Sequence, residues 1–322
     1  MKLGVLTNLF AAMTFEDAIK KFKELGIESL EIGCGGYPGK SHCDPEALLC
    51  DELRLAEWLA LIDKYGMEIS ALSVHGNPVH PDKKEAERYH KDFENAVLLA
   101  EKIGVDTVVT FSGCPGGSAE DKMPNWATCA WPEEYLKVLD YQWNEVLIPY
   151  WKKTAEFCKA HGVTKIAFEM HPGFCVYNPE TLLRLRAAVG DIIGANFDPS
   201  HLIWQGIDPV AAIRALRGAI YHFHAKDTKI DKYNSSVNGV LDTKHYTDEA
   251  NRSWIFRAVG YGNGQDYWRD IISALRLAGY DKVMSIEHED SLMTPYEGLS
   301  KAVAFLKNSV IKEQKPDGIS WA

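Results

Sequence analysis

Four successive β-rich segments in the second half of the chain end in side chains that can bind a metal ion or carry a proton. These residues are Glu169, Asp198, His224 and Glu287. Side chains alternate between the two faces of a strand, so all four can point to one inward face. The residues two positions earlier are then expected a layer below: Ala167, Asn196, His222 and Ser285. Because converging carboxylates repel one another unless a cation neutralises them, the pattern predicts a metal centre.

The expected metal centre holds one divalent ion. Three carboxylates and one imidazole form a hard, oxygen-rich ligand set, and octahedral coordination leaves two positions for substrate oxygens or water. This set suits Mn²⁺ best. It also accommodates Mg²⁺ or Co²⁺, and it suits Zn²⁺ less well.

Such a centre could make a carbon-bound hydrogen of a sugar acidic. A metal chelated by a carbonyl and an adjacent hydroxyl stabilises the enediolate that remains after proton loss. Glu169 and Glu287 are the expected catalytic pair, one removing a proton and the other returning one to the opposite face. The result is epimerisation. Proton return to the adjacent carbon gives isomerisation, and loss of a β-substituent gives elimination; the ligand types leave these three outcomes open.

Further polar and aromatic residues follow the strand ends and are expected to contact the substrate. His201 lies three residues after Asp198, and a Lys-Asp pair follows His224. Other candidates end earlier strands or lie in the loop after the fourth strand, where Trp126 and Trp143 are also expected in a lid. The full predicted substrate-binding set is His201, Lys226, Asp227, His75, Glu31 and Trp131.

The elements that must position these residues repeat along the chain. Seven glycines each end a helix-like segment before a short run rich in Val, Ile, Phe and Tyr. With a first strand at residues 3–7, eight strands are expected to start near residues 3, 29, 68, 106, 165, 193, 219 and 282. No GxGxxG or GxxxxGK motif supports an open doubly wound sheet. We therefore expect one α/β domain over residues 1–322, a (β/α)₈ TIM barrel with long βα loops after strands 4 and 7.

Composition excludes several other classes of protein. The chain has 322 residues, 46 % of them hydrophobic, and a formal net charge of −10. That charge disfavours nucleic-acid binding. Its apolar runs are too short to span a bilayer, and its start lacks a signal-peptide layout, so no membrane association and a cytoplasmic location are expected. Seven cysteines without a CxxC pair indicate reduced thiols.

The strand-end motifs FEMHP, NFDPSH, HFHAKD and SIEHED resemble those of a known family. This is the sugar phosphate isomerase/epimerase group of xylose-isomerase-like TIM barrels, which includes ketose 3-epimerases and inosose-processing enzymes. The resemblance covers nearly the whole chain. It implies a metal held by Glu169, Asp198, His224 and Glu287, with the two glutamates as acid and base groups. It also implies that His201 contacts a substrate oxygen, and that the substrate is a small carbohydrate such as a ketose, oxidised sugar or inosose.

Three other functions share features of this pattern. A lyase could cleave 3-oxo-glycosides by β-elimination through the same enolate, as one subunit of a complex. An apurinic endonuclease resembles the barrel but needs three zinc ions, a basic face and a histidine at the end of strand 4, where Ser112 and Gly113 stand here. A third alternative is a non-catalytic sugar binder. The sequence leaves homo-oligomers and hetero-complexes open. It contains no basic cluster for a phosphate, which favours an unphosphorylated substrate.

Overall fold

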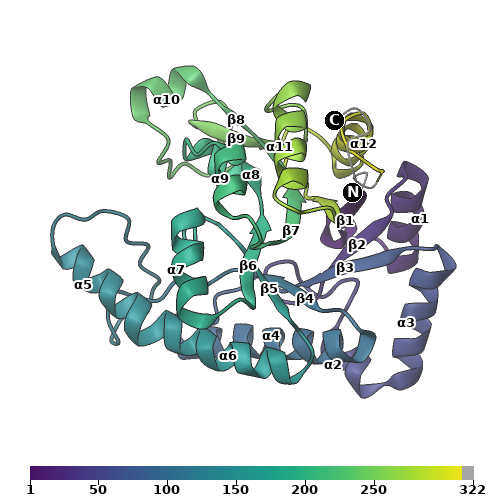
Figure 1. The fold of residues 1–322 in the computed structure, drawn as a ribbon, viewed down its shortest axis with the longest axis horizontal. Coiled ribbons are helices and arrows are strands. Elements are labelled where there is room, and N and C mark those ends of the chain that lie inside the picture. The colour runs from purple at the N-terminus through teal and green to yellow at the C-terminus, as the bar shows by residue number, and fades with distance from the viewer. Residues whose placement is uncertain (314–322) are drawn as a thin grey trace, which may run out of the picture.

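A computed structural model describes residues 1–313 and shows a closed barrel of eight parallel strands surrounded by helices (Figure 1). The barrel order is β1-β10-β7-β6-β5-β4-β3-β2. The strands are β1 (Lys2–Leu6), β2 (Ser29–Gly33), β3 (Glu68–Ser73), β4 (Thr107–Thr110), β5 (Lys165–Glu169), β6 (Ile193–Phe197), β7 (Ile220–Ala225) and β10 (Val283–Ile286). Each begins within one residue of its predicted position. The predicted (β/α)₈ fold is therefore confirmed.

Helices cover the outside of the strands. They are α1 (Phe15–Leu25), α2 (Pro45–Cys50), α3 (Glu52–Lys64), α4 (Lys83–Ile103), α5 (Glu134–Asp140), α6 (Ile148–Ala160), α7 (Pro179–Val189), α8 (Pro199–Trp204), α9 (Pro209–Ala215), α10 (Lys232–Asn238), α11 (Gln265–Leu277) and α12 (Pro295–Lys307). A 3₁₀ turn, η1 (Thr7–Phe10), follows β1, and a π-helical segment, η2 (Tyr141–Leu147), joins α5 to α6.

Local signals in the sequence explain where several helices begin and end. The side chains of Thr14, Asn178, Asp208 and Thr294 each accept a hydrogen bond from a backbone N–H of the following first turn. Such caps satisfy donors that have no partner inside the helix. All seven glycines predicted to end helices have a positive φ angle, which an L side chain rarely adopts.

The long segment after β7 contains two strands that the sequence analysis missed. β8 (Asp227–Ile230) and β9 (Trp254–Arg257) pair antiparallel in a separate sheet. Their partners are far apart in sequence and α10 intervenes, so no hairpin turn signal marks them. Helices α5 and α10 belong to the two long connections that follow β4 and β7, and both lie away from the barrel (Figure 1).

The barrel interior is packed beneath its C-terminal end. Ala71, Val109 and Ala167 form a small buried cluster inside the strands, against which Tyr221 packs. A much larger core lies between the strands and the helices. No helix in residues 1–313 is long and apolar enough to cross a membrane. The seven cysteines are all unpaired, as predicted.

Candidate active site

The structure brings the four predicted ligand residues together at the C-terminal end of the barrel. They lie at the ends of β5, β6, β7 and β10, which are neighbours in the barrel. Each offers a ligand atom within 4.8 Å of the ligand atoms of the other three: Glu169, Asp198, His224 and Glu287. Glu287 is partly exposed and the other three are buried. Strand alternation therefore identified the right face.

The prediction of two flat layers needs correction. Glu169 pairs in register with Asn196, and His224 pairs with Ser285, so at these two steps the ligand of the next strand lies one layer higher. Between β6 and β7 a register shift pairs Asn196 with His222, so Asp198 and His224 lie at the same level. The strands of a closed barrel are staggered along its axis, which accounts for the rise at the other two steps. The four side chains still converge, because each is long enough to bridge the difference in height between neighbouring strands.

Two buried atoms in this cluster have no hydrogen-bond partner, Oδ2 of Asp198 and Nδ1 of His224. The other oxygen of Asp198 accepts a hydrogen bond of 2.8 Å from the backbone N–H of Ser200, at the start of α8. Nδ1 of His224 lies 3.1 Å from Oε2 of Glu169 and 3.0 Å from Oε2 of Glu287. A buried carboxylate oxygen 3.1 Å from the ammonium of Lys226 and an imidazole nitrogen beside two further carboxylates fit a divalent cation.

Lys226 supplies positive charge at the rim of the cluster. Its Nζ lies 2.8 Å from Glu287, 3.0 Å from Glu289 and 3.1 Å from Asp198. Burial lowers the pKa of Lys226, but the carboxylates outweigh burial and hold that pKa well above its usual value. Burial has the opposite effect on Glu287 and raises its pKa, but the positive charges of Lys226 and His224 outweigh burial and lower the pKa of Glu287 to about 2. Lys226 thus stays charged in the place predicted for it.

Asp198 and His224 show the electrostatic strain of this cluster. Burial, together with the carboxylates of Glu169 and Glu287, raises the pKa of Asp198 to about 7. Burial lowers the pKa of His224, but Glu31, Glu287 and Glu169 raise it well above its usual value. Both shifts indicate that the site has an excess of negative charge.

Histidines surround Glu169. Nε2 of His75 lies 3.0 Å from Oε2 of Glu169, and Nε2 of His201 lies 3.0 Å from Oε1. The amide of Asn196 donates a weaker hydrogen bond of 3.4 Å to Oε2. Burial raises the pKa of Glu169, but hydrogen bonds from His201 and His224 hold it well below its usual value. His75 also lines the pocket described next, whereas His201 is buried behind Glu169 and does not line it.

A pocket of about 410 Å³ opens above the cluster. Its aromatic wall comes from Phe111 and Phe174, whose rings stack at 4.3 Å, and His171 lies 4.9 Å from Phe111. The pocket is lined by Leu6, Asn8, Tyr37, Pro38, His75, Phe111, Glu169, His171, Phe174, Lys226, Glu287 and Glu289. A polar floor beneath an aromatic wall suits the hydroxyl edge and the C–H face of a small carbohydrate.

The predicted site omits four polar residues of this pocket: Asn8, Tyr37, His171 and Glu289. His171 and Glu289 could have been found. Each follows a predicted ligand by two residues, Glu169 and Glu287 respectively. The same alternation that identified the ligands could have placed them on the inward face, one step further from the strand.

Besides His201, three predicted substrate-contacting residues do not line the pocket. Glu31 is fully buried beneath His224, whose Nε2 lies 2.9 Å from both of its oxygens. Asp227 is also fully buried, and its carboxylate accepts hydrogen bonds from the backbone of residues 260–263 and the indole of Trp268. Trp131 is 80 % exposed and does not line the pocket. These positions contradict a direct role in substrate contact, because other protein groups or solvent occupy the surroundings of each side chain.

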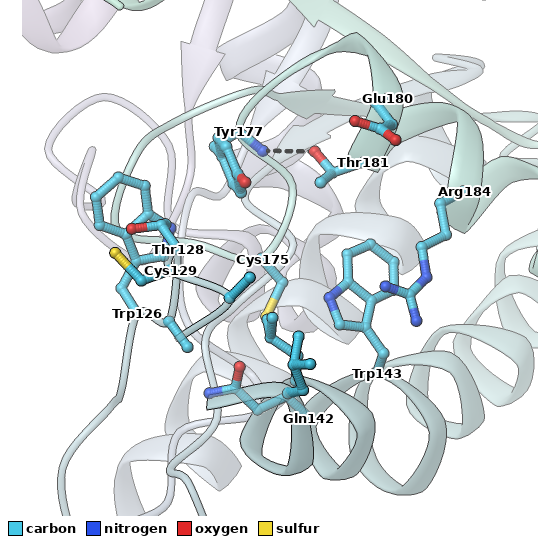
Figure 2. Close-up of a pocket in the computed structure, with 14 residues that line it drawn as sticks. Trp126, Thr128, Cys129, Gln142, Trp143, Cys175, Tyr177, Glu180, Thr181 and Arg184 are labelled. Atoms are coloured by element: carbon cyan, nitrogen blue, oxygen red, sulfur yellow. Dashed lines mark hydrogen bonds between the residues drawn. The ribbon is translucent and has the colours of Figure 1, made fainter. Parts of the chain in front are cut away.

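The predicted tryptophan lid borders a different cavity. This second cavity, of about 270 Å³, lies between the loop after β4, η2 and the start of α7, and Figure 2 shows Trp126, Gln142, Trp143 and Arg184 around it. The guanidinium of Arg184 lies 4.1 Å from the ring centroid of Trp143. Trp126 donates a hydrogen bond to the carbonyl oxygen of Phe174; Phe174 lines the first pocket and the next residue, Cys175, lines the second cavity.

The fold is a closed (β/α)₈ barrel, and a cluster of carboxylates and a histidine lies at the C-terminal ends of its strands. These two features place the protein in the class of barrels with a candidate metal centre. Within that class the chain belongs to the xylose isomerase-like TIM barrel family, which it matches over residues 19–309.

Curated relatives extend this comparison. The chain is 42 % identical over 313 residues to the uncharacterized protein YfiH of Bacillus subtilis, covering 96 % of this chain and 99 % of that protein. It is 32 % identical over 279 residues to the rhizopine catabolism protein MocC of Rhizobium meliloti, covering 85 % and 74 %. An inosose dehydratase of Geobacillus thermodenitrificans is 21 % identical over 94 % of this chain and 92 % of that protein.

Solved structures share the fold at low sequence identity. A probable 3-DHS dehydratase, AsbF of Bacillus anthracis, has a TM-score of 0.65 at 18 % identity, covering 96 % of this chain and 99 % of that chain. The IOLI protein, solved with a zinc atom, has a TM-score of 0.65 at 20 % identity, covering 96 % and 98 %. An L-ribulose 3-epimerase has a TM-score of 0.62 at 18 % identity, covering 96 % and 94 %.

Proposed function

We propose that this protein is a divalent-metal-dependent sugar isomerase or epimerase. The observation that carries the proposal is the convergence of four ligand atoms within 4.8 Å of one another beneath a pocket of about 410 Å³. Its family and the names of its relatives, which include an epimerase and dehydratases of sugar-like molecules, support the same reading.

The residues that would hold the cation are Glu169, Asp198, His224 and Glu287. A divalent cation, with Mn²⁺ expected from the ligand types, would act there as a Lewis acid toward a carbonyl and its neighbouring hydroxyl. The positive charge would also relieve the repulsion that the raised pKa of Asp198 reports.

Two glutamates are placed to move the proton. Glu169 is held between His75 and His201, and Glu287 lies beside Lys226, so the two carboxylates have different proton-donating neighbours. Both line the pocket. One, as a carboxylate, would remove a proton from the carbon next to the carbonyl, and the other, as a carboxylic acid, would deliver its own proton to the opposite face of the planar intermediate. His201 would donate a hydrogen bond to a substrate oxygen.

The charge of the pocket favours an unphosphorylated substrate. Glu169, Glu287 and Glu289 line it, and Lys226, its only lysine or arginine in the described chain, is shared by three carboxylates. A divalent cation would leave little net positive charge to attract a phosphate dianion. A neutral ketose, oxidised sugar or inosose fits these charges better.

The test combines metal analysis with isotope exchange. Purified protein loaded with Mn²⁺ is incubated in D₂O with a panel of ketoses, inososes and 3-oxo-glycosides, and deuterium is located by NMR. We expect one metal ion per chain and deuterium at the carbon next to a carbonyl in at least one compound. A protein that binds no Mn²⁺, Mg²⁺, Co²⁺ or Zn²⁺, or a loaded protein that exchanges no hydrogen in any of them, contradicts the proposal.

A second candidate is β-elimination through the same intermediate, as in a lyase acting on 3-oxo-glycosides or a dehydratase. Lys226 favours it, because its ammonium group lies among Glu287, Glu289 and Asp198 and could assist departure of an oxygen leaving group. The dehydratases among the similar proteins support it as well. Product analysis separates the candidates, since elimination releases water or an aglycone and epimerisation releases neither.

A further inference from the structure

The side chain of Glu31 crosses the barrel interior to reach His224. Glu31 lies on β2 and His224 on β7, which are three strands apart around the barrel. Nε2 of His224 lies 2.9 Å from both carboxylate oxygens of Glu31. Both residues are fully buried, so water does not compete for this contact.

Other donors complete the surroundings of Glu31. The hydroxyl of Ser285 donates a hydrogen bond of 2.6 Å to Oε2, and the hydroxyl of Ser73 donates to Oε1. His222 is oriented differently, because its Nδ1 lies 3.1 Å from the amide oxygen of Asn196 and 3.8 Å from Glu31. The Glu31 carboxylate therefore accepts at both oxygens, and its strongest contact is with His224.

This arrangement determines which nitrogen of His224 can bind a metal. A carboxylate that already accepts two hydroxyl protons takes a third hydrogen bond only from a protonated nitrogen, so Nε2 of His224 carries a proton. An imidazole that binds a metal gives up its other ring proton, so the lone pair offered to the cation is on Nδ1. Nδ1 is the buried atom without a hydrogen-bond partner, 3.0–3.1 Å from Glu287 and Glu169.

We infer that Glu31 is a positioning residue that holds His224 with its Nε2–H toward β2 and its Nδ1 toward the metal site formed with Glu169, Asp198 and Glu287. This inference rests on the metal centre of the proposed function. Acceptors behind a ligating histidine commonly fix its ring and raise its donor strength, and their loss lowers metal affinity about 10- to 100-fold. Glu31 thus acts through His224 without touching the substrate.

The first measurement needs no variant. Protein labelled with ¹⁵N at histidine is loaded with Zn²⁺, a diamagnetic probe, and the two ring nitrogens of His224 are assigned by long-range ¹H–¹⁵N NMR. We expect a protonated Nε2 and a metal-bound Nδ1. A metal-bound Nε2 overturns the inference, and it leaves the proposed function intact because the metal is still bound.

The second measurement compares metal affinity with stability. Glu31→Gln removes the charge and one acceptor oxygen, and the Kd for Mn²⁺ from calorimetric titration should rise about 10- to 100-fold. Asp92→Asn is the matched control. Asp92 is also buried, pairs with Lys40 and accepts a hydrogen bond from Gly36, so its loss should lower the melting temperature without changing the Kd.

The outcomes separate the two ideas. Unchanged Mn²⁺ affinity in folded Glu31→Gln contradicts the positioning role while leaving the metal centre in place. Wild-type protein that binds neither Mn²⁺ nor Zn²⁺ removes the metal centre itself. Should Glu31→Gln fail to fold, the NMR assignment of wild-type His224 decides the inference alone.

Discussion

The residues at the centre of the site differ more in their surroundings than in their types. Glu169 is held by His75 and His201, whereas Glu287 is partly exposed and contacts Lys226. The pKa of both carboxyls lies below its usual value; His224 lowers both, while His201 acts on Glu169 and Lys226 on Glu287. The two glutamates therefore differ in the groups beside them, which suits different roles in proton transfer.

Replacing either glutamate tests this division of roles. We expect Glu169→Gln and Glu287→Gln to fold normally and to lower the rate of deuterium exchange into the substrate at least about 100-fold at saturating metal. A glutamine oxygen can still ligate a cation but cannot take up a proton at neutral pH. The control is Glu68→Gln, an exposed change at the opposite end of the barrel. Full exchange activity in either active-site variant would rule out the proposed proton-transfer pair.

Lys226 offers a test of how the site balances its charge. Lys226→Met removes a buried ammonium that contacts three carboxylates. Without metal, the free energy of unfolding should fall by about 3–5 kcal/mol, because buried negative charge is left uncompensated. With Mn²⁺ the loss should be smaller, since the cation compensates the same charge. Urea titrations with EDTA and with Mn²⁺ measure both values, and equal losses would argue against a shared site.

Exposed Lys229→Met serves as the control for the lysine experiment. Lys229 lies three residues further along the chain, and its Nζ donates a hydrogen bond to the carbonyl of Gly262 instead of contacting the cluster. Its replacement should change the free energy of unfolding only slightly, with or without metal.

Among the elements, short turns after the strands carry the side chains of the pocket. The chain leaves β2 through a turn in which Gly36 has φ +60, and a Cβ at this position would lie 1.9 Å from the carbonyl oxygen of His75. The backbone at residues 74–75, just after β3, therefore packs directly against this turn. Since His75 contacts Glu169, the turn supports the wall of the site from behind.

A pair of glycine variants isolates this close approach. Gly36→Ala should lower the free energy of unfolding by more than the roughly 1–2 kcal/mol that a left-handed backbone alone costs an L residue, because the His75 carbonyl must also move. Gly39→Ala is the matched control, with φ +75 and no atom within 4 Å of the added Cβ. Equal losses in the two variants, measured by urea denaturation, would show that the contact with His75 contributes nothing.

At the scale of the whole molecule, barrel closure gathers negative charge that the isolated strands would not bring together. The four candidate ligands come from residues 169, 198, 224 and 287, and only neighbouring strands in the closed barrel place them within 4.8 Å. Folding without a cation must therefore overcome repulsion, and a bound cation should favour the folded state over the unfolded one.

Metal binding should accordingly be visible in thermal unfolding. At a free Mn²⁺ concentration 100 times Kd, linkage predicts about 2.7 kcal/mol of added stability and a rise in melting temperature. Excess EDTA should reverse the rise. Differential scanning calorimetry over a series of Mn²⁺ concentrations measures it, and a melting temperature independent of Mn²⁺, Mg²⁺, Co²⁺ and Zn²⁺ would count against a metal centre.

Features that depend on residues close together in the chain could be predicted from the sequence. Glycines at helix ends, side-chain caps and buried strand runs are local signals, so the barrel and its strand starts could be predicted. Alternation along single strands identified the four candidate ligands, because each points inward from its own strand. The two-stranded sheet of β8 and β9 carried no comparable local signal.

Contacts between residues far apart in the chain became visible in the folded barrel. Glu31 follows a register shift between β2 and β3 and contacts His224, 193 positions away, so its role beneath the site depends on how the closed barrel aligns its strands. Asp227 is next to Lys226 in sequence but turns into the loop at residues 260–263. Trp131 remains exposed although it belongs to the predicted lid. Their surroundings are set by closure and packing, which strand alternation does not encode.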